Sequence, residues 1–243
     1  MDSLISFGAG VNSVAMTILL VNEGWRGPIV FCDTGCEWPE TYCYLDYFER
    51  EWLAPRGMEI TRLGAEWRDE LDRASLIDFC VHHRTTPFAG MRWCTDKWKV
   101  RPLTKWAAAQ GIERQLIGIA SDERHRQKGR PCPLIDRGIT RKGCIEIIKA
   151  AGLDVPQKSG CYICPFMRVD QWRELYRRHP ELYERAANLE RLSSERRGER
   201  TVLMVSGDRT LDDWRVTFDG QGALLDDDDW DGLLEYKPCV CGL

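Results

Sequence analysis

A glycine-containing loop near the start of the chain has the residue types of a phosphate-binding turn. The segment Gly8-Ala-Gly-Val-Asn-Ser13 follows a short apolar run and precedes a stretch with helical periodicity. A strand that turns through glycines into a helix presents unpaired amides and the positive end of the helix dipole, which together favour an anion. A plain strand-to-helix turn is the alternative. The predicted phosphate-contacting residues are Ser6, Phe7, Gly8, Ala9, Gly10, Asn12 and Ser13.

The order of residues in this loop excludes two common nucleotide-binding motifs. No lysine follows the glycines, so the loop is not of the GxxxxGK[ST] type. Ser13 occupies the position of the third glycine in the GxGxxG dinucleotide fingerprint, so that motif fails as well.

Short apolar runs alternate with helical patterns through the first half of the chain. Strands are predicted at Leu4–Phe7, Pro28–Cys32, Met58–Leu63 and Gln115–Ile119, and helices at Val14–Gly24, Glu40–Leu53 and Lys97–Gln110. This alternation predicts an α/β fold with a mostly parallel sheet and helices on both faces. Ligands of such sheets bind beyond the carboxyl ends of the strands, where the glycine loop falls.

The second half of the chain predicts a smaller, mainly helical region that contains cysteines. Its predicted elements are helices at Thr140–Ala151, Asp170–Arg178 and Pro180–Leu192 and an added strand at Thr201–Val205. We therefore expect two domains, a nucleotide-binding domain over residues 1–155 and a helical subdomain with the tail over 156–243.

Several segments together resemble one known group. Gly8–Ser13 resembles the SGGxDS pyrophosphate loop of the ATP-pyrophosphatase (PP-loop) and sulfonucleotide-reductase superfamily. Cys32-Asp-Thr-Gly35 with Trp38-Pro-Glu-Thr41 is similar to the DTGxxFPET stretch of phosphoadenosine phosphosulfate (PAPS) reductases. Gly118–Glu123 with Arg126 resembles that family's GxRxxE…R segment, and Arg92-Trp-Cys94 its cysteine-bearing segment. The chain is identified as a divergent member, of the sort found on mobile elements and CRISPR-linked loci.

The resemblance implies a Rossmann-like (HUP-type) fold and an adenine nucleotide as ligand. It implies that the base lies near Phe31, Asp33 and Thr34, with Asp33 on the ribose or a metal, although an Asx turn would also explain Asp33. It implies ATP, or PAPS or its unphosphorylated analogue APS, with Mg²⁺ accompanying ATP. The residues expected on phosphate or sulfate after strand four are Gly118, Glu123, Arg124 and Arg126.

Three departures from the family pattern concern the substrate more than the fold. Asn12 stands where the pyrophosphatase loop has aspartate, Ala120 where reductases have arginine, and Gly8 where the loop has serine. The first change removes a charge that would help to hold Mg²⁺, and the second removes an anion contact.

The cysteines predict a metal site. Cys161 and Cys164 form a CxxC pair in a turn bounded by Gly160 and Pro165, the usual geometry for two ligands of one metal or cluster. By resemblance Cys94 is a third ligand, and Cys144 is the best fourth candidate, with Cys132 weaker. Thiolates suit a [4Fe–4S] cluster, which the resemblance favours, or structural Zn²⁺. A redox dithiol and simple burial of Cys94 and Cys144 are the alternatives.

Two reactions and one function without catalysis remain open. ATP cleavage at the α-phosphate, with adenylation or sulfur transfer as elaborations, is the first expectation, and Asn12 and Asp33 are its candidate catalytic residues. Thiol-dependent reduction of PAPS or APS to sulfite is the second. Cys241, in a tail similar to the ECGLH segment of the reductases, would be its nucleophile. A nucleotide-binding accessory protein without turnover is the third.

Composition sets the broad class of the 243-residue chain. Its net charge of −4 gives no overall basic field, and its eleven cysteines suit a reducing compartment. With no apolar run long enough for a membrane span, we expect a cytoplasmic protein that does not bind membranes. The sequence leaves open a homodimer and a nucleic-acid or protein acceptor, with the arginine-rich stretch 191–200 as a candidate patch.

Overall fold

The computed structural model describes residues 2–68, 74–198, 201–205 and 207–221. These residues fall into two compact units, each described by itself below. The first unit contains the described residues of 1–70 and 97–160, and the second contains those of 71–96 and 161–236. The division into domains at 155/156 stays a prediction; the described residues of 71–96 cluster with those that follow residue 160.

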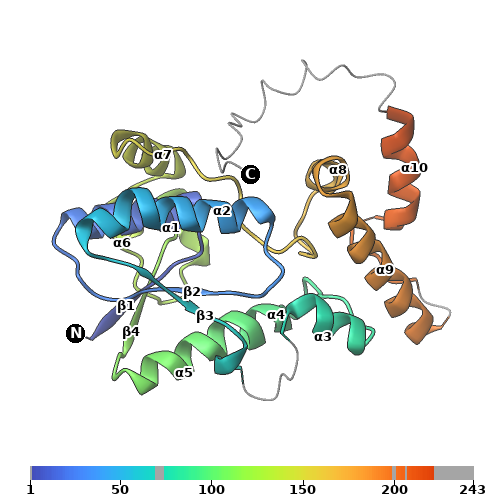
Figure 1. Cartoon of the computed structure of the whole chain (residues 1–243), viewed down its shortest axis with the longest axis horizontal. Helices are drawn as coiled ribbons and strands as arrows, with labels where there is room; N and C mark the ends of the chain where they lie inside the picture. The colour runs from blue at the N-terminus through green and yellow to red at the C-terminus, as the bar shows by residue number, and fades with distance from the viewer. Residues whose placement is uncertain (1, 69–73, 199–200, 206, 222–243) are drawn as a thin grey trace. The chain divides into compact units, whose positions relative to one another are not determined.

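Four short parallel strands form the sheet of the first unit (Figure 1). They are β1 (Ser3–Ser6), β2 (Ile29–Cys32), β3 (Ile60–Leu63) and β4 (Arg114–Ile117). The strand order is β3-β2-β1-β4, and β1 pairs in parallel with both β2 and β4. The four strands predicted in the first half of the chain and the predicted parallel α/β sheet are therefore confirmed.

Helices cover both faces of this sheet, as predicted. Alternate strand residues point to opposite sides: Ile5 and Ile29 pack in one cluster, whereas Leu4 and Val30 pack in another. The first cluster includes residues of α1 (Val11–Asn22), α2 (Pro39–Phe48) and α7 (Arg141–Ala150). The second includes residues of α5 (Arg101–Ala109), which lies on the opposite side of the sheet (Figure 1).

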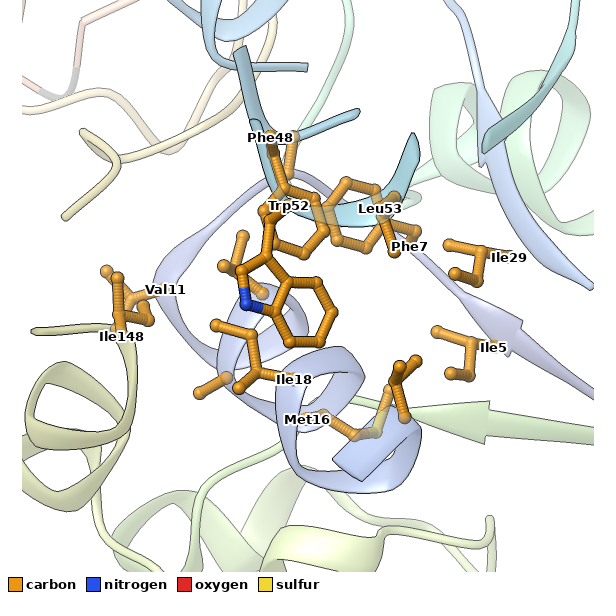
Figure 2. Close-up of a cluster of buried hydrophobic side chains, with 14 of the residues drawn as sticks. Ile5, Phe7, Val11, Met16, Ile18, Ile29, Phe48, Trp52, Leu53 and Ile148 are labelled. Atoms are coloured by element: carbon orange, nitrogen blue, oxygen red, sulfur yellow. The ribbon is translucent and has the colours of Figure 1, made fainter. Parts of the chain in front are cut away.

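Aromatic rings anchor the chain just before the glycine loop. Figure 2 shows Trp52 and Phe48 above α1, with Phe7 beside them. The Phe7 and Phe48 rings are stacked at 5.5 Å, and Phe48 stacks on Trp52 at the same separation. The side chain of Phe7 is therefore buried in the core. Only the backbone of Phe7 can take part in the glycine loop that follows.

The connections of the first unit are short helical turns. Residues Glu49–Leu53 continue α2 as a π-helical turn, and a similar turn, Asp96–Val100, leads into α5. After β4 come a 3₁₀ segment, Ser121–Arg126, and α6 (Pro133–Asp136). Helix α7 begins where it was predicted, because Thr140 accepts a hydrogen bond from the Gly143 amide as its N-cap.

The second unit is helical within its described residues. It contains α3 (Leu76–His82) and α4 (Trp93–Thr95) from the inserted segment, followed by α8 (Val169–Arg178), α9 (Pro180–Arg197) and α10 (Leu211–Gln221). The helices expected at 170–178 and 180–192 are confirmed, and α3 was not predicted.

The strand predicted at Thr201–Val205 is wrong, because side chains of α9 bind the backbone there. Ser194 Oγ accepts from the Val202 amide at 2.9 Å, and Glu190 Oε1 accepts from the Met204 amide at 2.7 Å. The other oxygen of Glu190 accepts from the Leu211 amide at 2.6 Å. A carboxylate that is 2% exposed therefore satisfies the Met204 amide, which a strand would have paired across a sheet, and also the first amide of α10.

The basic stretch that begins at Arg191 is partly neutralised. Arg191 donates to Asp212 at 2.9 Å and to Glu184 at 2.5 Å. The bond to Asp212 connects α9 to α10, so Arg191 has a structural role in the second unit. No helix within the described ranges has both the length and the apolar character needed to cross a bilayer.

Glu190→Ala should lower the free energy of unfolding by roughly 1–3 kcal/mol, because it leaves buried amides without an acceptor. Urea unfolding followed by circular dichroism measures the change. The matched control is Glu195→Ala, whose carboxylate is exposed and lies 3.7 Å from Arg84. That variant should change stability by less than about 0.5 kcal/mol. Equal losses in the two variants would contradict the role given to Glu190.

Candidate functional site

The glycine loop between β1 and α1 is closed by the hydroxyl of Ser13. Ser13 Oγ donates to the Gly10 carbonyl at 2.9 Å and accepts from the Gly10 amide at 3.1 Å. Ala9 adopts a left-handed conformation, with φ of 55°. The Ser13 hydroxyl, which was expected to donate to phosphate, therefore donates within the loop.

The first turn of α1 contains a buried amide side chain with an unused acceptor. Asn12 is 9% exposed, and its Nδ2 donates to Glu123 Oε2 at 2.9 Å. Its Oδ1 is buried and has no hydrogen-bond partner among the described residues. The first turn also carries no acidic side chain. The helix dipole favours an anion at the start of α1, and the unpartnered Oδ1, which is an acceptor, favours a ligand hydroxyl or a metal ion.

The chain leaving β4 packs directly on this turn. A Cβ added to Gly118 would lie 2.8 Å from the backbone nitrogen and Cα of Ser13. No side chain can be accommodated at that distance, since backbone atoms cannot rotate away. The contact explains the glycine at residue 118 and fixes the ends of β1 and β4 relative to each other.

The carboxylate of Glu123 joins the segments that follow β1 and β4. One oxygen accepts from Asn12 and the other accepts from Arg126 at 2.7 Å. Arg126 is about half exposed, and Arg124 is exposed. Arg124 and Arg126 thus follow closely after Glu123, the residue whose carboxylate binds the loop. Their guanidinium groups could bind an oxyanion ligand.

Asp33 forms the turn after β2. One of its carboxylate oxygens, Oδ1, accepts from the Gly35 amide at 2.7 Å and from the Tyr42 hydroxyl at 2.7 Å. The first bond is that of an Asx turn, the alternative considered for this residue. Burial, together with the Asp33 carboxylate, raises the pKa of Tyr42, so this phenol stays a donor to Asp33.

A cluster of charged residues beside Asp33 was missed at the sequence level. The buried carboxylate of Glu37 accepts from Thr34 Oγ1 at 3.0 Å and from Lys99 Nζ at 2.9 Å. Arg68 donates to the Asp33 carbonyl, and its guanidinium lies 4.0 Å from the centre of the Trp98 ring. Spacing alone gave no signal, since Arg68 and Asp33 are 35 positions apart and Lys99 and Glu37 are 62 positions apart.

Phe31 and Thr34, the residues expected near the base, have buried side chains. The side chain of Phe31 is 2% exposed and packs in the core that contains α1 and α2. Only its backbone is available at the sheet edge. Thr34 is likewise buried, with its hydroxyl donated to Glu37.

Residues 159 and 160 connect the segments that follow β1 and β2. The Trp38 amide donates to the Gly160 carbonyl at 3.0 Å. A Cβ on Gly10 would lie 2.8 Å from Ser159 Oγ. The predicted loop residues and the end of β2 are therefore parts of one edge of the first unit, as the parallel sheet required.

The predicted metal ligands Cys94, Cys144, Cys161 and Cys164 are distributed over both units. Cys144 lies in the hydrophobic core of the first unit, where burial raises the pKa of its thiol to about 11, and the other three belong to the second unit. Among the described residues, no three histidine, cysteine, aspartate or glutamate side chains are arranged to hold a metal ion. Cys241 lies outside the described residues.

The family follows from a comparison with known protein domains. The sequence model of the phosphoadenosine phosphosulfate reductase domain matches residues 2–139. The chain belongs to this family. The match covers the glycine loop, the turn at Asp33 and the segment through Arg126, which were the basis of the predicted resemblance.

Two curated proteins are similar in sequence to different lengths of this chain. The nin region protein ORF290 of Escherichia phage lambda is 29% identical over 156 residues, which cover 54% of this chain and 52% of the phage protein. Protein MJ0066 of Methanocaldococcus jannaschii is 24% identical over 218 residues, 79% of this chain and 42% of that protein. The chain thus spans about half the length of these relatives. The phage relative agrees with the expected mobile-element context.

Two solved structures are similar at low sequence identity. A PAPS reductase from Candida auris, in a phosphate complex, has a TM-score of 0.47 and 13% identity, covering 66% of this chain and 82% of its own. The U34-tRNA thiolase NcsA from Methanococcus maripaludis, with its [4Fe–4S] cluster, has a TM-score of 0.38 and 16% identity, covering 80% of this chain and 72% of its own.

Gly118→Ala should destabilise the chain by roughly 1–3 kcal/mol, because its methyl group would overlap the backbone of α1. Thermal and urea unfolding measure the effect. Gly220→Ala is the matched control, since a Cβ there meets nothing within 4 Å. An unchanged stability of the Gly118 variant would show that the packing of β4 on the loop is looser than described.

Proposed function

We propose that the first unit binds ATP with Mg²⁺ and cleaves it between the α- and β-phosphates, releasing pyrophosphate. The observation that carries the proposal is the buried Asn12, whose Oδ1 lacks a partner at the start of a helix that follows a glycine loop. A buried polar atom without a partner costs free energy unless a ligand satisfies it.

The phosphates would lie over Gly8, Ala9 and Gly10, against the first amides of α1. Anion binding at this position uses the helix dipole and the absence of acidic residues in the first turn. The base would lie at the end of β2, against backbone atoms and not against the ring of Phe31, which is enclosed in the core. Asp33 would bind the ribose through the carboxylate oxygen that the turn does not use, Oδ2.

In the proposed reaction, an oxygen nucleophile attacks the α-phosphorus. The new P–O bond forms as the bond from the α-phosphorus to the bridging oxygen breaks, and the electron pair leaves on pyrophosphate. Water as nucleophile gives AMP, and a nucleic-acid or protein acceptor would become adenylated. Asn12 Oδ1 would accept from a ligand hydroxyl or bind the Mg²⁺ that accompanies ATP, and Arg126 would offset charge that develops on the phosphate oxygens. Mg²⁺ would enter with ATP and neutralise the leaving pyrophosphate.

Membership of the PAPS reductase family favours a second candidate, reduction of PAPS or APS. The Cys241 thiolate would attack the sulfur of the sulfonucleotide, and the nucleotide would leave with the electrons of the broken S–O bond. A second thiol, supplied by a reductant, would then release sulfite and be oxidised to a disulfide with Cys241.

One incubation series separates the two candidates. Protein purified without oxygen is given ATP and, separately, PAPS, and AMP, pyrophosphate and sulfite are assayed. The proposal expects pyrophosphate from ATP at an unchanged rate in Cys241→Ser. Sulfite from PAPS that is lost in Cys241→Ser, with no pyrophosphate from ATP, would replace it by the second candidate. Tight ATP binding without either product would indicate a nucleotide-binding accessory protein.

Asn12→Ala should weaken binding of ATP with Mg²⁺ by about three- to tenfold, because it removes one polar contact of Oδ1 to a ligand hydroxyl or to Mg²⁺, worth about 0.5–1.5 kcal/mol. Titration calorimetry with ATP and Mg²⁺ measures the change. Asn22→Ala is the matched control, because Asn22 ends the same helix and is exposed. Unchanged affinity in the Asn12 variant, or an equal loss in both variants, would argue against the placement of phosphate at the loop.

A further inference from the structure

Three large apolar side chains of the second unit are exposed to solvent. Phe88 is 59% exposed, Met91 75% and Phe166 51%. Phe88 and Met91 belong to the loop between α3 and α4, and Phe166 lies between the CxxC turn and α8. Single exposed apolar residues are normal on a protein surface, whereas a contiguous group of them points to a binding site.

Arg92 connects the two aromatic rings of this group. Its backbone amide donates to the Phe88 carbonyl at 3.0 Å. Its guanidinium lies 5.4 Å from the centre of the Phe166 ring, which is a cation–π arrangement. Arg92 is itself exposed, so a positive charge and two rings reach solvent together.

Further rings continue from Trp93, the residue after Arg92. The Trp93 and Phe79 rings are 5.6 Å apart, and Phe79 lies 4.3 Å from the His83 ring. His83 is exposed, and Phe79 and Trp93 are partly exposed. Rings therefore extend from α4 along α3, which lies beside it in Figure 1. The aromatic surface is defined here as Phe79, His83, Phe88, Met91, Arg92, Trp93 and Phe166.

The loop that carries Phe88 is fixed at both of its ends. Arg84 and Arg92, which flank the loop, adopt left-handed conformations with φ of 47° and 49°. Residues other than glycine, asparagine or aspartate adopt this conformation only where surrounding contacts hold it. Thr86 and Pro87, immediately before Phe88, are buried. The exposed ring is thus presented from an anchored backbone, and binding a ligand to it costs little conformational entropy.

Two exposed carboxylates near α3 are bound to arginines. Asp78, in the first turn of α3, lies 3.4 Å from Arg185. Glu195, near the end of α9, lies 3.7 Å from Arg84. The net charge of these four side chains is zero, so the remaining arginines decide the sign of the charge around the aromatic surface.

Arg92 and Arg196 make that charge positive. Arg196 donates to the His83 carbonyl at 2.6 Å. A carbonyl has no net charge, so this bond positions the guanidinium without neutralising it. Exposed rings combined with guanidinium groups bind the bases and the phosphates of single-stranded nucleic acids. The electrostatic complement of a positive surface is likewise a polyanion.

We propose that the aromatic surface binds single-stranded nucleic acid. Bases would stack on the rings of Phe88 and Phe166, and phosphates would lie against the guanidinium groups of Arg92 and Arg196. Every base has a flat face, so such a surface takes single strands with little sequence preference and excludes the stacked bases of a duplex. Of the arginine-rich stretch 191–200, the proposal uses Arg196. It requires no nucleotide cleavage and holds whichever nucleotide the first unit binds.

Fluorescence anisotropy of labelled strands tests the proposal on the full chain without ATP. The probes are single strands of RNA and of DNA and the matching duplex, each about 20 nucleotides long, and we expect the single strands to bind at least about fivefold more tightly. Their affinity should fall by about tenfold between about 50 and 200 mM salt, as two or three phosphate contacts require.

Variants separate stacking from charge. Phe166→Ala should weaken binding by at least about fivefold, because the stacking of one base is lost, and Phe166→Trp should retain it. Val216→Ala is the control, since Val216 is 72% exposed on α10. Arg92→Gln should reduce the slope of log affinity against log salt by about 0.7, the effect of one phosphate contact. Arg50→Gln, at an exposed arginine of the first unit, should leave the slope unchanged.

Photo-cross-linking of the wild type to a strand that contains 5-bromouracil gives an answer that does not depend on folding of a variant. Cross-links on the peptides that contain Phe88 or Phe166 would support the proposal, and cross-links confined to other peptides would overturn it. No binding at low salt, equal affinity for the duplex, or the same affinity in Phe166→Ala as in Val216→Ala would also overturn it. A dimer in sedimentation that Phe88→Ala abolishes would assign the surface to a second copy of the chain instead. ATP is absent from every assay, so the proposed cleavage can fail while this surface stands.

Discussion

Much of the first unit depends on one close contact, that of the Gly118 backbone with the first turn of α1. No methyl group fits between Gly118 and the backbone of Ser13. The contact brings the segment after β4 against the segment after β1, although more than a hundred residues separate them in the chain. Asn12 can therefore reach Glu123, and the loop is shaped from two sides. A phosphate cradle made of backbone amides needs such support, because its atoms have no side-chain torsions with which to adjust.

The sequence contained enough information to predict the sheet and the edge where the candidate site lies. Strand β2 is an apolar run, β1, β3 and β4 mix apolar and polar residues, each strand is followed within two residues by glycine or a polar residue, and all four alternate with helical patterns. The direction of individual strand side chains was harder to predict. In a parallel sheet covered on both faces, Phe31 and Cys32 are both buried, so their pattern does not show which one faces α1 and which α5.

What could not be predicted depends on contacts between distant residues. Phe79 lies in an apolar helix beside Leu76 and Ile77, and an aromatic side chain there is typical of a core. Only its contact with the Trp93 ring makes it part of the aromatic surface. Likewise, Thr201–Val205 has the composition of a strand, but a carboxylate and a hydroxyl of α9 bind its amides instead. In each case a side chain elsewhere in the fold decided the outcome over local preference.

The order of the segments limits how the molecule can be divided. The chain leaves the first unit after β3, contributes α3 and α4 to the second, returns for α5 to α7, and then leaves again at residue 160. Neither unit is therefore one continuous stretch that could be expressed alone. A fragment that ends at residue 160 would keep Phe88 and Arg92 but lose Phe166, together with the helices on which α3 packs. Fragments cut at the family boundary near residue 139 would also lose α7, whose core residues cover α1.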